Sequence, residues 1–313
     1  MFSYNIDKYN LSEVKSLKLT RNQIYPKYTN LEKFNFLIDT KNIKIFKNKS
    51  KISSIGTCFA RNIKDYLIKN NYKYMVLAQG PCTNHSSARF DRVFNSSSLL
   101  QEFKRYEDDF EEPYLWELNQ DKKIFFLNPF RKNLCYNNIN DFKNEIIEHN
   151  FNVKKIVDTS DILILTLGQS EIVRCRKTNF VFAQVPPAQI YDKDLHSYEL
   201  LNENQNLENL NKIITILKKN ITLKIILTVS PIPLRATYRK DIDSIQANFE
   251  NKFSLINVAK KLSNIHSIVS YFPAFEIVYS IRDPFCDDAR HVQETTINHV
   301  MREFVKNYVF DES

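Results

Sequence analysis

The apolar residues of this chain form short continuous runs that alternate with stretches of helical spacing. Residues 161–168 make the clearest run, Asp-Ile-Leu-Ile-Leu-Thr-Leu-Gly, and residues 223–229 make a second. Continuous apolar runs of this length are typical of parallel strands that are covered on both faces. Shorter strands are predicted at 51–56, which ends in Gly56, and at 268–272.

Between these runs, apolar residues recur at the spacing of amphipathic helices. One such helix follows Gly56, and another is predicted around Ile245, Phe249, Phe253 and Ile256. Further helices are predicted over 97–106, 142–153, 207–217 and 297–308, and residues 123–127 are a candidate strand. The alternation predicts an α/β fold, a three-layer sandwich with a parallel, flavodoxin-like sheet. Ligands of such sheets bind beyond the carboxyl ends of the strands.

The chain has 313 residues and is 43% hydrophobic, which suffices for one large α/β domain. We assign residues 51–313 to this domain. Residues 1–50 alternate charged and aromatic side chains weakly and are interpreted as an N-terminal extension that packs on the core. Residues 105–150 have a mixed pattern, with an acidic, turn-like segment at 107–113, and are interpreted as a less regular insertion.

Charge and cysteine content narrow the class of protein. The net charge is +8, but basic residues are interleaved with acidic ones in no run longer than three, so no nucleic-acid partner is predicted. The five cysteines form no Cys-x-x-Cys pair, and the six histidines lack ligand spacing, so neither a metal site nor a redox motif is expected. Without a signal pattern or a long apolar run, the chain is predicted to be cytoplasmic, with free thiols and no membrane span.

Chemically reactive residues follow the predicted strands. Thr57 and Cys58 come directly after Gly56, at a helix N-terminus, where unpaired amides favour a thiolate or bind an oxyanion. The alternative is that Cys58 is a small buried apolar residue.

Two other polar clusters occupy similar places. Residues 168–171, Gly-Gln-Ser-Glu, follow the central strand, where glycine permits close approach of a substrate; an ordinary capped turn is the alternative. Asp288 lies three residues before His291, so it can orient the imidazole and leave the other ring nitrogen as a base. The alternative is a surface ion pair. The common position at strand ends favours one catalytic site.

Several ordered blocks resemble the GSCFA family. Residues 56–60, Gly-Thr-Cys-Phe-Ala, resemble its signature, with Thr57 in place of serine. The other matching blocks are 87–90, 99–101, 166–171, 228–237, 271–277 and 288–292. The resemblance runs from about Ile52 to Phe304 and is poor over 105–150.

The GSCFA family is in turn similar to SGNH esterases and acyltransferases. That similarity implies an SGNH-hydrolase-like fold and places the nucleophile at Cys58, with Asp288 and His291 as the remaining catalytic residues. The oxyanion or substrate-binding residues would be Gly56, Thr57, Gly168, Gln169, Ser170 and Glu171. Two features depart from the SGNH pattern. The asparagine of its Gly-x-Asn block is replaced, so Gln169 or Ser170 would substitute, and only Gly80 is available for its second glycine.

The resemblance implies an esterase or acyltransferase that uses a cysteine nucleophile. The expected substrate is a small molecule or carbohydrate, either an acylated glycan or an acyl thioester, and no cofactor is needed beyond acyl-CoA as a candidate donor. The alternative is a non-catalytic module that binds a glycan or a partner on a decayed SGNH fold, which the missing asparagine favours. Arg89, Arg235 and Arg290 are candidates for binding an anionic donor, although ordinary surface charge also explains them.

Overall fold

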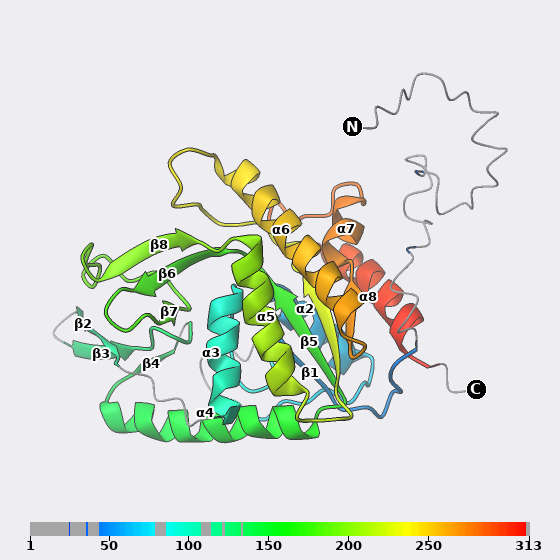
Figure 1. The fold of residues 1–313 in the computed structure, drawn as a ribbon, viewed down its shortest axis with the longest axis horizontal. Helices are drawn as coiled ribbons and strands as arrows, with labels where there is room; N and C mark the ends of the chain where they lie inside the picture. Colours follow the sequence, from blue (N-terminus) through cyan, green and yellow to red (C-terminus); the bar gives the residue numbers. More distant parts are fainter. Residues whose placement is uncertain are drawn as a thin grey trace.

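The structure is a computed structural model, in which strands and helices surround one central sheet with two smaller sheets to one side (Figure 1). It describes Tyr25, Phe36 and residues 44–78, 86–107, 114–120, 123–132 and 134–310. The predicted N-terminal extension, residues 1–50, falls largely outside the described residues, and so does Gly80. Phe46 lies within them: it is buried and forms a parallel bridge with Val309.

The central sheet has four parallel strands in the order β1 (Ile52–Gly56), β5 (Ile162–Leu167), β9 (Lys224–Val229) and β10 (Val269–Phe272). An isolated parallel bridge between Ile52 and Tyr74 extends the sheet beyond β1. The segment around Tyr74 therefore occupies the place of a second strand, which gives the strand order of flavodoxin-like folds. The predicted parallel sheet, with strands ending near Gly56, Gly168 and Ser230, is confirmed.

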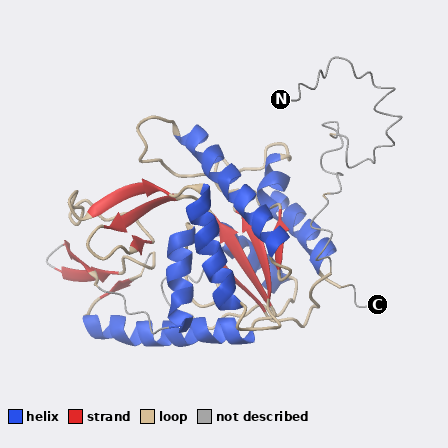
Figure 2. Ribbon diagram, viewed as in Figure 1, coloured by secondary structure: helices blue, strands red, loops and turns tan. Residues whose placement is uncertain are grey.

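Helices cover both faces of this sheet (Figure 2). All of β5 is buried, with Ile162 and Ile164 in one apolar cluster and Leu163 and Leu165 in another, as the two-residue period of a strand requires. The first cluster includes residues of α2 (Cys58–Lys69), α7 (Ala274–Tyr279) and α8 (Glu294–Tyr308). The second includes α3 (Ser96–Glu107), α4 (Ile139–Thr159), α5 (Glu203–Leu217) and α6 (Ser244–Ile265). The predicted three layers are confirmed.

Helix α6 has the predicted position but turns a different face to the core. The predicted apolar residues Ile245 and Phe253 are 70% and 54% exposed, whereas Asn248, Asn251 and Lys252 are buried. These polar side chains bind backbone groups of the loops that follow the central strands. Buried backbone groups need such partners, and this requirement outweighs the simple apolar pattern of the helix.

Two small antiparallel sheets were only partly predicted. One contains β2 (Trp116–Gln120), β3 (Lys123–Leu127) and β4 (Cys135–Tyr136), and lies in the region interpreted as an insertion. The other contains β6 (Glu171–Cys175), β7 (Val181–Phe182) and β8 (His196–Leu200). The Phe182 ring packs edge-on against Trp116, with centroids 5.0 Å apart, and so joins the two sheets. Of these strands only 123–127 was predicted, because it contains a continuous apolar run, whereas the others are only two residues long or are interrupted by polar residues.

A buried ionic network supports the block at 87–90 that the family resemblance includes. Arg131 donates to the Arg89 carbonyl at 2.7 Å, and His149 Nδ1 lies 3.0 Å from the Ala88 carbonyl oxygen. Burial and the charge of Arg131 lower the pKa of His149 to about 4, so the ring is neutral at pH 7. Burial opposes ionisation of Glu102, but Arg105, His149 and Arg131 together outweigh it, and the pKa of Glu102 falls to about 2. The network fixes the loop that leads to α3.

A very close approach of two strands lies where β1 ends. Gly56 has φ +139°, a conformation that side chains rarely allow, and a Cβ there would lie 2.2 Å from the Thr166 carbonyl oxygen. We therefore expect Gly56→Ala to lower the free energy of unfolding by about 3 kcal/mol or more, through backbone strain and overlap. Urea denaturation followed by circular dichroism measures this loss. An unchanged midpoint would contradict the close approach of β1 to β5.

Candidate active site

A cavity of about 690 Å³ opens at the carboxyl ends of β1, β5 and β9, where the sequence predicted a site. Its walls come from the loops that follow these strands, from the second small sheet, and from Lys132 in the connection between β3 and β4. Six predicted site residues line it: Thr57, Cys58, Gly168, Gln169, Glu171 and His291. Three others, Gly56, Ser170 and Asp288, lie outside the lining.

Helix α2 places Cys58 at the cavity. Thr57 caps this helix, since its Oγ1 accepts a hydrogen bond from the Phe59 amide at 3.2 Å. The same hydroxyl lies 3.0 Å from Thr166 Oγ1 and is buried. Cys58 is half-buried with a free thiol, and its amide has no hydrogen-bond partner among the described residues. Cys58 therefore brings a free thiol to the lining of the cavity, while the Thr57 hydroxyl serves as a cap.

His291 and Asp288 form a closely bonded pair on the loop before α8. The Asp288 carboxylate accepts hydrogen bonds from the Arg290 and His291 amides, at 3.0 and 2.9 Å, and contacts His291 Nδ1. The amide bonds and then the imidazole lower the pKa of Asp288 to about 2. Asp288 thus stays ionised at neutral pH and fixes the ring. His291 Nε2 has no partner within the described part of the chain, and the residue lines the same cavity as Cys58.

The loop at 168–171 differs from what the sequence predicted. The Gly168 and Gln169 amides both donate to the Phe94 carbonyl oxygen, at 3.1 and 2.9 Å, so they are not available to an oxyanion. The Ser170 amide donates to Asn251 Oδ1, and its hydroxyl accepts from Asn206. These residues hold the loop in place because each buried polar group has found a protein partner. The Gln169 Nε2 also donates to the Glu171 carbonyl oxygen, at 3.0 Å. These bonds argue against the 168–170 amides as oxyanion donors, whereas substrate binding by the cavity-lining residues Gly168, Gln169 and Glu171 stays a prediction.

Glu171 also has a structural partner. Its carboxylate accepts from the Thr237 hydroxyl at 2.9 and 3.0 Å and from the Tyr238 amide at 3.2 Å. Glu171 is buried and so fastens the loop after β9, which forms one side of the cavity.

Asn95 was missed by the sequence analysis. Its Oδ1 accepts from the Ser98 amide at 2.8 Å, which caps the start of α3. Its Nδ2 has no hydrogen-bond partner among the described residues, and Asn95 lines the cavity. An asparagine followed by Ser96-Ser97-Ser98 is a recognisable helix cap, but nothing in that signal indicates a cavity. The structure thus brings an asparagine amide donor to the site that lacked one in sequence.

Comparison with known proteins identifies the family. The statistical model of the GSCFA family matches residues 51–304. The chain belongs to the GSCFA family. No curated protein matches it.

Two solved structures show weak similarity to this GSCFA protein. A protein from Streptococcus pneumonia, provisionally described as a platelet activating factor, is 13% identical with a TM-score of 0.39, over 95% of this chain and 98% of that one. A carbohydrate esterase family 2 enzyme with a carbohydrate binding domain, from Corynascus thermopiles (Myceliophthora fergusii), is 15% identical with a TM-score of 0.28. That match covers 47% of this chain, which spans about a third (36%) of the esterase chain.

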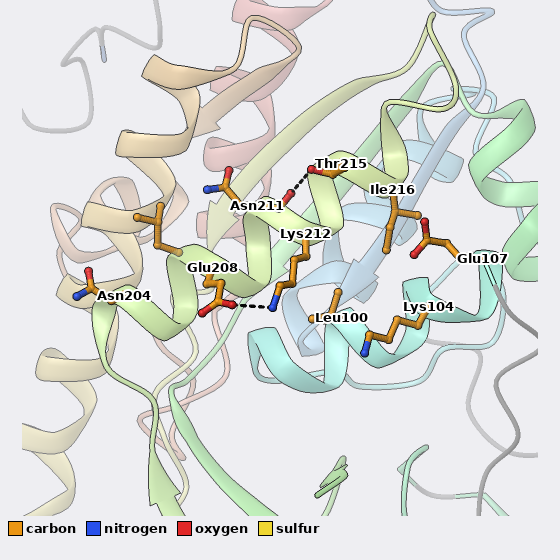
Figure 3. Close-up of a pocket in the computed structure, with 10 residues that line it drawn as sticks. Leu100, Lys104, Glu107, Asn204, Glu208, Asn211, Lys212, Thr215 and Ile216 are labelled. Atoms are coloured by element: carbon orange, nitrogen blue, oxygen red, sulfur yellow. Dashed lines mark hydrogen bonds and ion pairs between the residues drawn. The ribbon is translucent and has the colours of Figure 1, made fainter.

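A second, more open groove of about 500 Å³ lies between α3 and α5 of the GSCFA protein (Figure 3). Glu208 and Lys212 of α5 form an ion pair of 2.6 Å at its surface. The groove is lined by neither a thiol nor an imidazole, so the cavity at Cys58 is the better candidate for chemistry. Within the described ranges, no helix is long and apolar enough to cross a membrane, and no cluster of three acidic, histidine or cysteine side chains could hold a metal.

Lys252 is a buried amine in the lining of the cavity at Cys58. The side chain is buried on α6, and its Nζ donates to the Gly168 carbonyl oxygen at 2.7 Å. Burial without a carboxylate partner lowers its pKa from 10.5 to about 7. The amine therefore holds the loop after β5 and changes its charge near neutral pH.

This shift predicts a pH dependence of stability. Between about pH 7 and pH 10 Lys252 is neutral in the folded protein and charged in the unfolded chain, which binds more protons. The stability of the wild type relative to Lys252→Met should therefore rise with pH in this window, by up to about 1.4 kcal/mol per pH unit. Urea titrations of both proteins at pH 7, 8 and 9 give the difference. A difference that is constant with pH would show that Lys252 keeps its ordinary pKa.

Proposed function

We propose that this GSCFA protein is an SGNH-like esterase or acyltransferase that works through an acyl-enzyme on Cys58. The observation that carries the proposal is the shared cavity of Cys58 and His291, with Asp288 bound to the other ring nitrogen. A nucleophile, a base and a group that orients the base are the parts that covalent acyl transfer requires.

The proposed reaction has two steps. His291 Nε2 takes the Cys58 proton, and the thiolate attacks the carbonyl carbon of an ester or thioester. The bond from that carbon to the leaving oxygen or sulfur then breaks, and the leaving group takes the proton from the imidazolium. In the second step His291 deprotonates water or an acceptor hydroxyl, which attacks the new thioester. The acyl group leaves on that oxygen, and Cys58 regains a proton. Asp288 stabilises the charged imidazole throughout.

Two donors are the candidates for the oxyanion hole of each step. One is the Cys58 amide, at the positive end of α2, and the other is Asn95 Nδ2. Neither has a partner among the described residues. The amide lies on the attacking residue itself, so it needs no further positioning. Asn95 is fixed by its capping bond to Ser98. Together they replace the donors that the sequence placed at 168–170.

The proposed substrates follow from the thiol and from the family resemblance. A thiol exchanges readily with thioesters, so acyl-CoA is a candidate donor. The resemblance to SGNH enzymes favours a carbohydrate or glycan as the acylated molecule or as the acceptor. A cavity of about 690 Å³ has room for a sugar residue together with an acyl chain.

Incubation with activated acyl esters and acyl-CoA should place an acyl group on Cys58, which hydroxylamine removes. His291→Ala should slow its formation about 10²–10⁴-fold through loss of the base. Cys58→Ala should abolish the adduct, while Thr57→Ser and Cys286→Ala should retain it. Intact mass and peptide mapping measure each outcome. An adduct on Thr57 would move the nucleophile, and loss of all adducts with unchanged glycan binding in Cys58→Ala would favour the non-catalytic binding module.

Asn95 allows a test of the oxyanion donor without loss of the helix cap. Asn95→Asp and Asn95→Ser both keep an oxygen that can accept from the Ser98 amide, but both lack the amide donor. We expect either change to slow acyl transfer about 10²–10³-fold with an unchanged melting temperature. Initial rates and thermal denaturation are measured on the same samples. Full activity in both variants would exclude Asn95 from the oxyanion hole.

A further inference from the structure

The cavity at Cys58 carries an excess of positive charge. Five basic side chains line it: Arg92, Lys132, Arg235, Lys252 and Arg290. Glu171 is the only acidic residue of the described chain in this lining, and its carboxylate is bound to Thr237 and Tyr238. The sequence did not show this concentration, because the five basic residues are spread over some 200 positions.

Arg92 lies 3.6 Å from the Asp91 carboxylate, and the Lys252 amine loses its charge above about pH 7, so the unbalanced positive charge of the cavity comes from the other three basic residues. Lys132 and Arg235 have no carboxylate within ion-pair distance among the described residues, and Lys132 Nζ instead lies 5.0 Å above the Phe94 ring. Arg290 donates from Nη2 to the Pro233 carbonyl at 3.2 Å, while its Nε is buried without a partner. Arg89, in contrast, lies near Glu145 at 3.9 Å and does not line the cavity.

Their mutual proximity is visible in the ionisation of Lys132. Burial and then the charge of Arg92 lower the pKa of Lys132, Cys58 and the buried Asp91 act in the opposite direction, and Arg235 lowers it further. Lys132 therefore lies within electrostatic range of two other cations and of the candidate nucleophile. Like charges held together in a partly enclosed cavity repel, and an anion bound among them relieves that repulsion.

We propose that Lys132, Arg235 and Arg290 form an anion-binding subsite beside Cys58, which takes a substrate bearing a phosphate or carboxylate group. Arg and Lys side chains bind both anions through charge-assisted hydrogen bonds. The subsite would hold the charged part of the substrate while the acyl carbonyl meets the thiol. The assignment of a substrate class rests on the proposed acyl transfer, whereas anion binding in this cavity does not.

Alkylation of thiols tests the subsite without any acyl chemistry. Iodoacetate is an anion and iodoacetamide is neutral, and both react with the same thiolate, so the ratio of their rates cancels the ionisation of the thiol. At low ionic strength we expect this ratio to be about tenfold higher at Cys58 than at the exposed Cys286 of the same molecule. The excess should fall as salt is added. Equal ratios at the two cysteines would overturn the proposal.

Matched variants separate a local subsite from net charge. Lys132→Gln/Arg235→Gln should bring the Cys58 ratio to that of Cys286. Lys261→Gln/Arg302→Gln removes the same charges from exposed helical positions outside the cavity and should leave the ratio unchanged. An equal fall in both double variants would mean that overall charge, not a subsite, attracts the reagent.

Protection experiments distinguish the two kinds of anion. Inorganic pyrophosphate or glucuronate should slow alkylation of Cys58 by iodoacetamide but not that of Cys286, and the stronger protectant identifies a phosphate or a carboxylate.

Pyrophosphate should also raise the melting temperature of the wild type but not of Lys132→Gln/Arg235→Gln. If Cys58 reacts with neither alkylating reagent, the rise in melting temperature with pyrophosphate becomes the test of the subsite. Absence of that rise in the wild type overturns the proposal. A positive ratio without acyl adducts would retain the subsite and reject the acyl-transfer mechanism.

Discussion

The geometry of the cavity depends on how closely the end of β1 approaches the end of β5. Thr166 is the contact: its Oγ1 accepts from the Thr57 amide at 2.7 Å and pairs with the Thr57 hydroxyl. The approach is possible because Gly56 and Gly168 have no side chains, since a Cβ on Gly168 would lie 2.7 Å from Thr57 Cγ2. The whole chain contains three glycines, and two of them are used here. This close approach directs the Thr57 hydroxyl toward Thr166, while Cys58 lines the cavity.

The sequence predicted the central sheet because β5 and β9 are buried on both faces and so read as continuous apolar runs. It also predicted one site for Cys58 and His291, because residues after parallel strands gather at one edge, and both residues line the same cavity. It did not predict Asn95, whose capping role gives no sign of its second, unbonded atom. Nor did it identify the buried face of α6. There Asn251 and Lys252 form hydrogen bonds with backbone groups of a loop that lies far away in the sequence and near only in the folded chain.

The polar face of α6 explains how a cavity can exist at the sheet edge without collapse of its walls. Asn248 accepts from the Leu234 amide, Asn251 from the Ser170 amide, and Lys252 donates to the Gly168 carbonyl. One helix therefore ties down the loops that follow two neighbouring strands. Buried polar groups that are satisfied in this way rigidify their surroundings, and a rigid frame is what positions catalytic groups.

The division between the central sheet and the two small sheets has a consequence for how such a protein diversifies. Cys58 and His291 belong to the central fold, whereas Ile172, Val173 and Phe182 of the second small sheet only line one wall of the cavity. That wall consists of short antiparallel strands, which tolerate insertion and replacement better than the buried parallel core. Changes confined to this wall would therefore reshape the mouth of the cavity, and with it the range of molecules admitted, while leaving Cys58 and His291 in their present frame.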